Sequence, residues 1–350
     1  MIVITGGAGF IGSNLAAALE ERGERDLVVC DRLGSDGKWR NLGKRELAAI
    51  VPPNALIDFL DEHAREINIL FHLGAISSTT ETDADLIAAT NFTVSQRLWE
   101  WAAATETRFI YASSAATYGG GEAGFDDEFS VAALARLKPL NAYGWSKHLF
   151  DRRLARRLES HGPRPTQWAG LKFFNVYGPN EYHKGAMQSV AVQIYRRAAN
   201  GEVARLFRSH RAGVADGGQK RDFVYVRDAV DMMLWLYDHP AVNGLFNVGS
   251  GTARSFADLA AAVFHAIGRE PRIDYVDTPT EIRDKYQYFT EARMDRLRAA
   301  GYDKPSTAER RSGPAFGPTP HTLPGRWAMG LNVRQQLQGF SPIARAQPAH

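Results

Sequence analysis

The chain has 350 residues, 44% of them hydrophobic and 23% charged, which is the balance of a globular protein with one large domain or two smaller ones. Its net charge of +3 comes from the segment after Pro305, where five arginines face one glutamate, so residues 1–305 sum to −1 and no basic face for nucleic acid is expected. A single cysteine, Cys30, excludes an internal disulfide, and no apolar run reaches the about 18 residues of a membrane helix.

The first part of the chain alternates between buried strands and helices. Residues 2–5 form an apolar run that ends in a glycine-rich turn, residues 13–23 have helical spacing, and residues 26–31 form a second apolar run. Strand, glycine turn, helix and strand make one βαβ unit, the start of a parallel sheet in an α/β fold. The alternation continues with strands predicted at 67–75, 108–114 and 167–178 and a helical pattern at 83–105.

From about residue 176 the pattern changes. Residues 187–202 indicate a helix, 210–218 a loop, 221–240 a strand that leads into a helix, and 245–251 a strand and turn. A further helix is predicted at 255–271, with Ser255 as its N-cap and Gly268 near its end.

The segment 306–350 differs from the rest. It is rich in proline, arginine and glycine and has neither helical nor strand periodicity, so we expect a disordered tail. The abrupt loss of pattern suggests the hypothesis of a shifted reading frame. A nucleotide sequence in which no other frame past codon 305 encodes an amphipathic helix would refute it.

The stretch GGAGFIG places glycines at positions 6, 9 and 12, between a strand and a helix. Gly6 allows the tight turn out of the strand, Gly9 lets the backbone approach a pyrophosphate, and Gly12 lets the helix pack close to the sheet. The phosphates would face free N–H groups at a helix N-terminus. In this context the motif predicts a dinucleotide site, although a glycine-rich turn alone is weak evidence.

The end of the second strand bears on which dinucleotide is bound. Asp31 stands where an acid hydrogen-bonds the adenosine ribose, which favours NAD. Arg32 and Lys38 follow it and would instead hold the 2′-phosphate of NADP, unless both are solvated loop cations. Gly74 and Ala75, in HLGA at the end of a later strand, are expected to line the adenine and phosphate side.

The stretch YGWSK places Tyr143 and Lys147 one helical turn apart. A phenol has a pKa near ~10, and a neighbouring ammonium is expected to lower it, so that Tyr143 serves in proton transfer. Lys147 would also hydrogen-bond a nicotinamide ribose, and YASSAATYG supplies Ser113, Ser114 and Thr117 as hydroxyl donors at a strand end. The alternative for the pair is an ordinary surface turn of a helix.

These motifs together resemble the extended short-chain dehydrogenase/reductase family of nucleotide-sugar enzymes: the N-terminal glycines, YASSAATYG, YGWSK, FFNVYGP and RDFVYVRD. Three longer strings, HLGAISSTTETD, NVYGPNEYHKGAM and DKYQYFTEARMDRLRAAGYDKP, are similar to the ADP-heptose 6-epimerase branch of that family. The resemblance covers roughly residues 1–305 and leaves the tail without a counterpart.

The resemblance implies inversion of C6″ of the heptose in ADP-D-glycero-β-D-manno-heptose, for lipopolysaccharide core biosynthesis, with transient oxidation by bound NADP and re-reduction on the opposite face. It implies Tyr143 and Lys184 as the two acid/base groups, Ser114 as the hydrogen-bond donor to the reacting oxygen, and Lys147 as their catalytic neighbour. Burial would lower the pKa of a lysine enough for this work. The alternative for Lys184 is a loop lysine that binds phosphate.

Further contacts are implied by position in the family motifs. Cofactor contacts are expected at Phe10, Ile11, Asp31, Arg32, Lys38, Asn91, Lys147 and Val176. Substrate contacts are expected at Ser114, Asn175, Ala186, Gln193, Phe207, Arg221 and Tyr286. Arg221 would pair with the substrate diphosphate through a bidentate fork, and its alternative is a surface ion pair.

We therefore predict a Rossmann-type doubly wound parallel sheet in residues 1–175, to which 215–249 return. A smaller C-terminal α/β domain for the substrate is predicted from 176–214 and 250–305. The expected partners are the nucleotide sugar and further copies of the chain, with a pentamer as the ring that the resemblance suggests; no nucleic acid, membrane or metal partner is expected. The missing basic leader favours a cytoplasmic location.

Three other functions stay open at this point. Another nucleotide-sugar epimerase, such as one like UDP-glucose 4-epimerase, would share all the short motifs. A 4,6-dehydratase would favour an acidic pair beside the serine, which SSAATYG lacks. A non-catalytic NADP-binding regulator would often lack the tyrosine or the lysine, and both are present. NAD in place of NADP also stays open.

Overall fold

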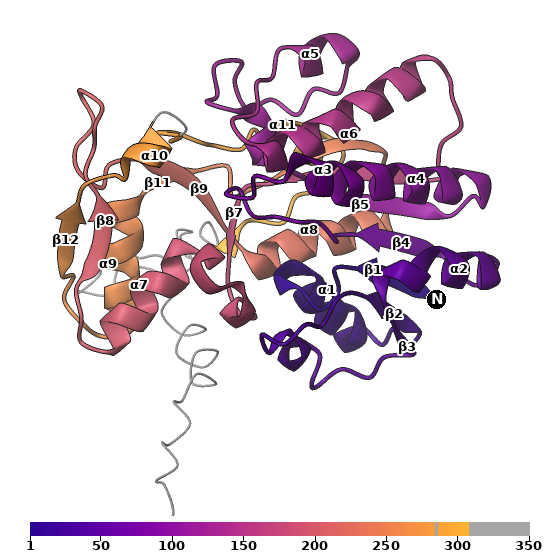
Figure 1. The fold of residues 1–350 in the computed structure, drawn as a ribbon, viewed down its shortest axis with the longest axis horizontal. Coiled ribbons are helices and arrows are strands. Elements are labelled where there is room, and N and C mark those ends of the chain that lie inside the picture. The colour runs from indigo at the N-terminus through magenta and orange to yellow at the C-terminus, as the bar shows by residue number, and fades with distance from the viewer. Residues whose placement is uncertain (284–285, 308–350) are drawn as a thin grey trace, which may run out of the picture.

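The structure is a computed structural model that describes residues 1–283 and 286–307, so the predicted tail lies outside the described residues from position 308 on (Figure 1). Seven parallel strands form the main sheet, in the order β10-β6-β5-β4-β1-β2-β3. Their bounds are β1 (Ile2–Thr5), β2 (Leu27–Cys30), β3 (Ala49–Val51), β4 (Ile69–His72), β5 (Arg108–Ser114), β6 (Trp168–Phe173) and β10 (Gly244–Val248).

Helices cover both faces of this sheet. One apolar core joins it to α1, α8 and α11, and a second joins it to α2, α4 and α6. The α-helices are α1 (Phe10–Glu21), α2 (Leu56–Glu62), α3 (Ala84–Ile87), α4 (Val94–Ala104), α5 (Val131–Ala135), α6 (Ala142–Glu159), α7 (Val190–Ala199), α8 (Val226–Asp238), α9 (Phe256–Ala266), α10 (Thr280–Arg283) and α11 (Asp295–Ala299). The predicted doubly wound α/β architecture is thus confirmed.

Short helices complete the connections. Among the described residues, four have 3₁₀ geometry, and the fifth, η3, is a π-helical stretch between α3 and α4. They are η1 (Lys38–Asn41), η2 (Pro53–Ala55), η3 (Ala88–Thr93), η4 (Ala115–Tyr118) and η5 (Tyr182–Met187). None of the helices within the described ranges is long and apolar enough to cross a membrane.

A smaller part of the molecule lies at one side of the main sheet (Figure 1). Its strands form a three-stranded sheet, β11-β9-β7, and a two-stranded sheet, β12-β8, and a third apolar core packs them with α7 and α9. Their bounds are β7 (Asn175–Tyr177), β8 (Ala204–Phe207), β9 (Lys220–Tyr225), β11 (Ala253–Ser255) and β12 (Ile273–Val276). Ser255 caps α9 through a capping box with Asp258, as its position predicts.

The single strand predicted at 167–178 is wrong. It is two strands, because a tight turn between the Phe174 carbonyl and the Val176 N–H, at 2.9 Å, redirects the chain after β6. β6 stays in the main sheet, whereas β7 leaves its carboxyl edge to pair with β9. This turn places Asn175 over the edge of the sheet where ligands of such folds bind.

A buried ion pair ties α6 to the main sheet. Lys172 of β6 and Asp151 of α6 lie 3.0 Å apart, and both side chains are 0% exposed. Asp151 also accepts hydrogen bonds from Tyr111 and Ser113 of β5, at 3.0 and 2.7 Å. Lys172 donates further to Thr117 of η4. The cluster therefore fixes α6 against β5 and β6.

Removal of one partner of this pair should cost far more than removal of both charges, because it leaves an unpaired buried charge. We expect Lys172→Met to lower the free energy of unfolding by about 3–5 kcal/mol. Lys172→Met combined with Asp151→Asn should recover part of that loss. Urea denaturation of the three proteins measures this, and a double variant no more stable than Lys172→Met would contradict it.

Candidate active site

The glycine turn after β1 is as tight as the motif predicts. Gly6 adopts φ +68°, and a Cβ there would lie 2.7 Å from the Gly74 nitrogen. A Cβ on Gly12 would lie 2.3 Å from the Gly6 carbonyl oxygen, so α1 packs this closely only with glycine. Gly9 is the N-cap of α1 and has no side chain to occupy the helix end. The turn thus leaves the first N–H groups of α1 available to an anion.

Asp31 follows β2 and organises the neighbouring loop. It accepts hydrogen bonds from the Ala8 and Arg32 N–H groups, at 2.9 and 2.7 Å. Lys38 forms an ion pair with Asp31 Oδ1, the oxygen that also accepts from the Arg32 N–H, at 2.6 Å. A hollow of about 430 Å³ opens beside Asp31 and Arg32, between the ends of β2 and β3. Lys38 is therefore paired with a carboxylate that lines this hollow and is not a freely solvated cation.

The loop after β4 lies against the glycine turn. The Gly74 N–H donates to Thr5 Oγ1 at 3.1 Å, and Thr5 also bonds His72, which is buried and serves the structure. Asn91 is 0% exposed and holds the Ile76 backbone through both ends of its amide. The side chain of Asn91 thus braces this loop, and its predicted cofactor contact stays a prediction.

The start of α6 carries the YGWSK residues to the carboxyl edge of the sheet. Asn141 caps the helix through the Gly144 N–H, at 2.8 Å. A Cβ on Gly144 would lie 2.7 Å from the Ala116 carbonyl oxygen, so this glycine lets α6 approach the turn after β5. Tyr143 then lies beside Ser114, and Lys147 is 3% exposed one turn further on.

Burial dominates the pKa values of these groups. It raises the pKa of Tyr143, and the side chain of Ser114 acts in the opposite direction. The expected lowering of the Tyr143 pKa by Lys147 is therefore wrong for the structure as described. Burial lowers the pKa of Lys147 to about 8, and the negative charge of Asp151 opposes that change.

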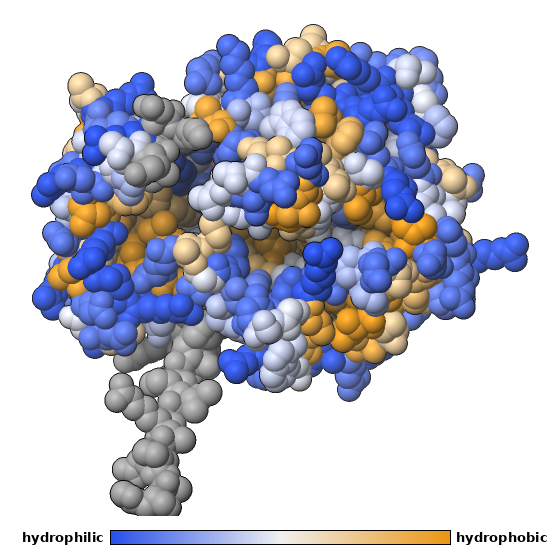
Figure 2. All heavy atoms as spheres, in the orientation of Figure 1, coloured by the Kyte–Doolittle hydropathy of each residue, from blue (hydrophilic) through white to orange (hydrophobic). Residues whose placement is uncertain are grey.

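A cleft of about 360 Å³ brings seven of the predicted residues together. They come from five elements, α1, β5, α6, β7 and η5, and they are Phe10, Ile11, Ser114, Tyr143, Asn175, Val176 and Lys184. Apolar side chains lie in the recess between the two parts of the molecule (Figure 2). Burial lowers the pKa of Lys184, as predicted for an acid/base lysine, while Glu181 raises it.

An aromatic cluster adjoins the cleft through Phe256. Arg221 is 6% exposed and lies between the rings of Phe256 and Tyr286, 5.6 and 5.4 Å from their centroids. Phe207 packs edge-on against Tyr286 at 6.0 Å. The surface ion pair considered for Arg221 is thus wrong, because the guanidinium is buried and its two terminal nitrogens bond the Lys220 and Gln287 carbonyls.

Two predicted substrate contacts lie near the cleft mouth. Ala186 is exposed on η5, and Gln193 is exposed on α7, where its amide donates to the Gln188 carbonyl at 2.8 Å. Neither lines the cleft.

Three residues near this site were missed from the sequence. Asp151 stands four positions after Lys147, a spacing that places both on one helix face. Lys172 is a cation in the otherwise apolar run WAGLKFF, which is a signal of a buried partner. Glu181 precedes Lys184 by three positions and lies 3.9 Å from it.

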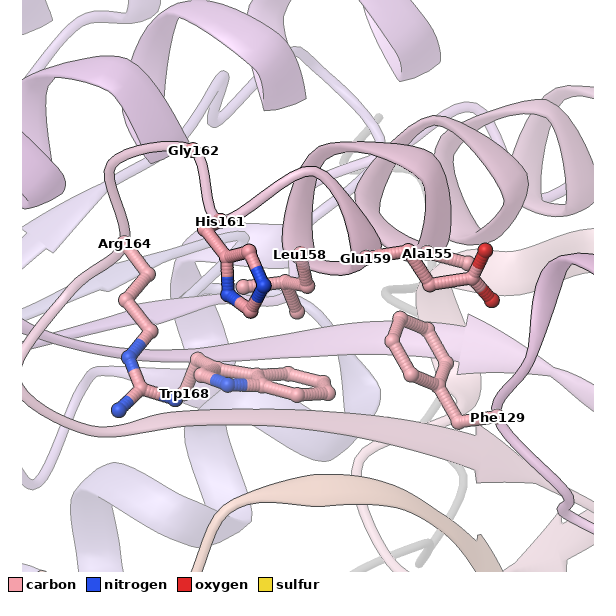
Figure 3. A pocket seen from close by; sticks show the side chains of 8 residues that line it. All are labelled: Phe129, Ala155, Leu158, Glu159, His161, Gly162, Arg164 and Trp168. Atoms are coloured by element: carbon pink, nitrogen blue, oxygen red, sulfur yellow. The ribbon is translucent and has the colours of Figure 1, made fainter.

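Another hollow, between Phe129 and Trp168, lies at the opposite edge of the sheet, where β6 begins (Figure 3). Its other lining residues include His161 and Arg164, from the loop after α6. None of the predicted site residues lines this hollow, whereas seven line the cleft at Tyr143. The cleft at Tyr143 is therefore the better candidate for the active site.

The chain is similar in sequence and fold to known proteins. Residues 2–249 match the NAD dependent epimerase/dehydratase family. The chain is 50% identical over 303 residues to an ADP-L-glycero-D-manno-heptose-6-epimerase of Nitratidesulfovibrio vulgaris strain DP4, covering 86% of this chain and 92% of that protein. It is 43% identical over 312 residues to the enzyme of that name from Fusobacterium nucleatum, covering 87% and 93%.

Among solved structures, the chain is similar to the Helicobacter pylori ADP-L-glycero-D-manno-heptose-6-epimerase, with a TM-score of 0.71 and 27% identity. That match covers 98% of this chain and 96% of the other. Sequence, fold and cleft lead to one conclusion: the chain belongs to the NAD dependent epimerase/dehydratase family.

Proposed function

We propose that this chain inverts C6″ of the heptose in ADP-D-glycero-β-D-manno-heptose, giving ADP-L-glycero-β-D-manno-heptose for the lipopolysaccharide core. The observation that carries the proposal is that Tyr143 and Lys184, from different elements, line one cleft beside the glycine turn. The similarity to proteins named for this reaction, over 86% of the chain, supports the choice of substrate.

Inversion at a carbon that bears a hydroxyl needs hydrogen removed from one face and returned to the other. A bound nicotinamide dinucleotide would supply the hydride acceptor and donor. Proton-transfer groups are then needed on both sides of the oxidised carbon. Tyr143 reaches the cleft from α6, and Lys184 reaches it from η5. Ser114, beside Tyr143, is the hydrogen-bond donor for the reacting oxygen.

The pKa shifts suit the two groups to their work. Burial raises the pKa of Tyr143, so the phenol keeps its proton at neutral pH in the resting site. Burial lowers the pKa of Lys184, so this lysine releases its proton more readily than an exposed one. The substrate hydroxyl would exchange its proton with one group during oxidation and with the other during reduction.

The residues of the glycine turn fit a dinucleotide. The N–H groups at the start of α1, near Gly9, Phe10 and Ile11, would hold the pyrophosphate, and Gly6, Gly12 and Gly74 give the close approach of backbone that this needs. Lys147 would hold the nicotinamide ribose, and Val176, which lines the cleft, would lie beside the cofactor. We infer NADP as the cofactor, because Lys38 and Arg32 supply positive charge beside Asp31 where the 2′-phosphate would lie.

The smaller part of the molecule would hold the substrate, in keeping with the substrate-binding domain predicted at 176–214 and 250–305. Asn175 at the cleft would contact the sugar. Arg221 and the Phe207–Tyr286 cluster would receive the ADP part, with the charge of Arg221 toward the diphosphate. We further propose that copies of the chain assemble into a homo-oligomer, a pentameric ring.

The activity itself is tested with purified full-length protein and ADP-D-glycero-β-D-manno-heptose, with the 6″-epimer followed by NMR. We expect both epimers at equilibrium. Epimer exchange with UDP-glucose in its place would favour a 4-epimerase. Protein that binds NADP but exchanges neither sugar would favour a non-catalytic regulator.

Tyr143→Phe and Lys184→Met test the two acid/base groups separately. Each change removes one proton-transfer group, so kcat should fall by about 10²–10⁴-fold in both variants. Fluorescence titration should give a Kd for NADP within about threefold of the parent for Lys184→Met. Full activity in either variant would remove that residue from its proposed role.

Lys38→Ala tests the cofactor preference. Loss of the cation leaves Asp31 without its ion-pair partner, and its charge would then repel a 2′-phosphate, so affinity for NADP should fall by about tenfold or more while affinity for NAD changes little. Isothermal titration with each dinucleotide measures both constants, and Lys44→Ala, at an exposed lysine nearby, is the matched control. Equal losses for NADP and NAD would contradict a role at the 2′-phosphate.

A further inference from the structure

Glu181 is a buried carboxylate at the start of η5, the segment that carries Lys184. Its side chain is 0% exposed. Oε1 accepts hydrogen bonds from the Gly178 N–H and the Ser189 hydroxyl, at 3.0 and 2.8 Å, and Oε2 accepts one from the Ser189 N–H, at 2.6 Å. Burial raises the pKa of this carboxylate, while Lys184 and the three hydrogen-bond donors act in the opposite direction and favour its charged form.

These bonds join three consecutive pieces of chain. Gly178 follows β7, Glu181 opens η5, and Ser189 is the N-cap of α7. Gln188 closes the same loop from its other end, because its amide donates to the Glu181 carbonyl at 3.0 Å. The segment between the bonds contains a kink at Gly185, with φ +51°. The Glu181 carboxylate therefore clamps both ends of the loop that presents Lys184 to the cleft.

The same carboxylate is the negative charge beside Lys184. Lys184 Nζ lies 3.9 Å from Glu181 Oε2, and its other side faces the Phe10 ring of α1, 5.2 Å from the centroid. Other titratable groups around Lys184 include His183 and Tyr182 on η5, Tyr177 of β7 and, across the cleft, Tyr143 of α6. Lys38 and Asp31 lie further out and act on His183.

We propose that Glu181 is a positioning residue for Lys184, which clamps the η5 loop and supplies the buried negative charge that holds the ammonium at the cleft. The inference rests on the proposed acid/base role of Lys184. Glu181 would then have two separable effects. It would fix the position of the Lys184 side chain, and it would set the pH at which Lys184 loses its proton.

The sign of the second effect follows from the neighbours. Burial lowers the pKa of Lys184, and Glu181 opposes this. Glu181→Gln removes the opposing charge and keeps the size of the side chain, so Lys184 should lose its proton at a lower pH. A side chain that only braces the loop would reduce activity at every pH and leave that midpoint in place.

The test measures Lys184 itself. Only a neutral amine reacts with acetic anhydride, so the rate of Lys184 acetylation against pH, mapped by mass spectrometry on the resting full chain, gives its titration midpoint. We expect the midpoint to fall by about one pH unit in Glu181→Gln. The limb of the kcat/KM profile that belongs to Lys184 should move by the same amount. Glu128→Gln, at an exposed surface ion pair with Arg136, should change neither.

Glu181→Asp is a second variant with a smaller expected effect. It keeps the negative charge, but its side chain is one methylene shorter, so the carboxylate lies further from Lys184. The titration midpoint of Lys184 should fall by less in Glu181→Asp than in Glu181→Gln. If Glu181→Gln does not fold, Glu181→Asp alone provides the test. An unchanged midpoint in the folded variants overturns the proposal. If Lys184→Met is fully active, the proposed function fails instead, while the acetylation result still decides whether Glu181 acts on Lys184.

Discussion

The buried pair of Asp151 and Lys172 is the constraint on which the geometry of the candidate active site depends. Asp151 lies two turns after Tyr143 and one turn after Lys147 on the same helix, and it is bonded to β5 and β6 at once. Because a helix is stiff over two turns, fixing Asp151 against the sheet fixes the direction of both side chains. Ser114 ends the strand to which Asp151 is tied, so serine and tyrosine meet.

Burial also sets the chemistry of the cleft. The packing that positions Tyr143, Lys147 and Lys184 removes them from water, and this raises the pKa of the phenol and lowers the pKa of both lysines. Buried carboxylates stand beside the two lysines, Asp151 near Lys147 and Glu181 near Lys184, and each opposes the effect of burial. The two lysines are thus tuned by the same device, built independently on α6 and η5.

Much of this arrangement could be predicted from the sequence, because local patterns determine it. The glycines at 6 and 12 require a close turn, Ser255 caps its helix, and the alternation of strands and helices gives the doubly wound sheet. Local patterns cannot predict features that depend on contacts between residues far apart in the sequence. The break of 167–178 into two sheets depends on pairing with β9, and the burial of Asn91 and Arg221 depends on distant partners. The direction of the Tyr143 pKa depends on desolvation by the whole cleft, which helical spacing to Lys147 does not reveal.

The central claim is that Tyr143 and Lys184 flank one sugar carbon beside the nicotinamide ring. A crystal structure of the full chain with NADP and the nucleotide heptose bound tests it most directly. We expect Tyr143 Oη and Lys184 Nζ within about 3 Å of the C6″ oxygen in its two orientations, on opposite faces of the carbon. A complex in which either group points away from that carbon, or in which the glycine turn after β1 contacts no dinucleotide, would contradict the account.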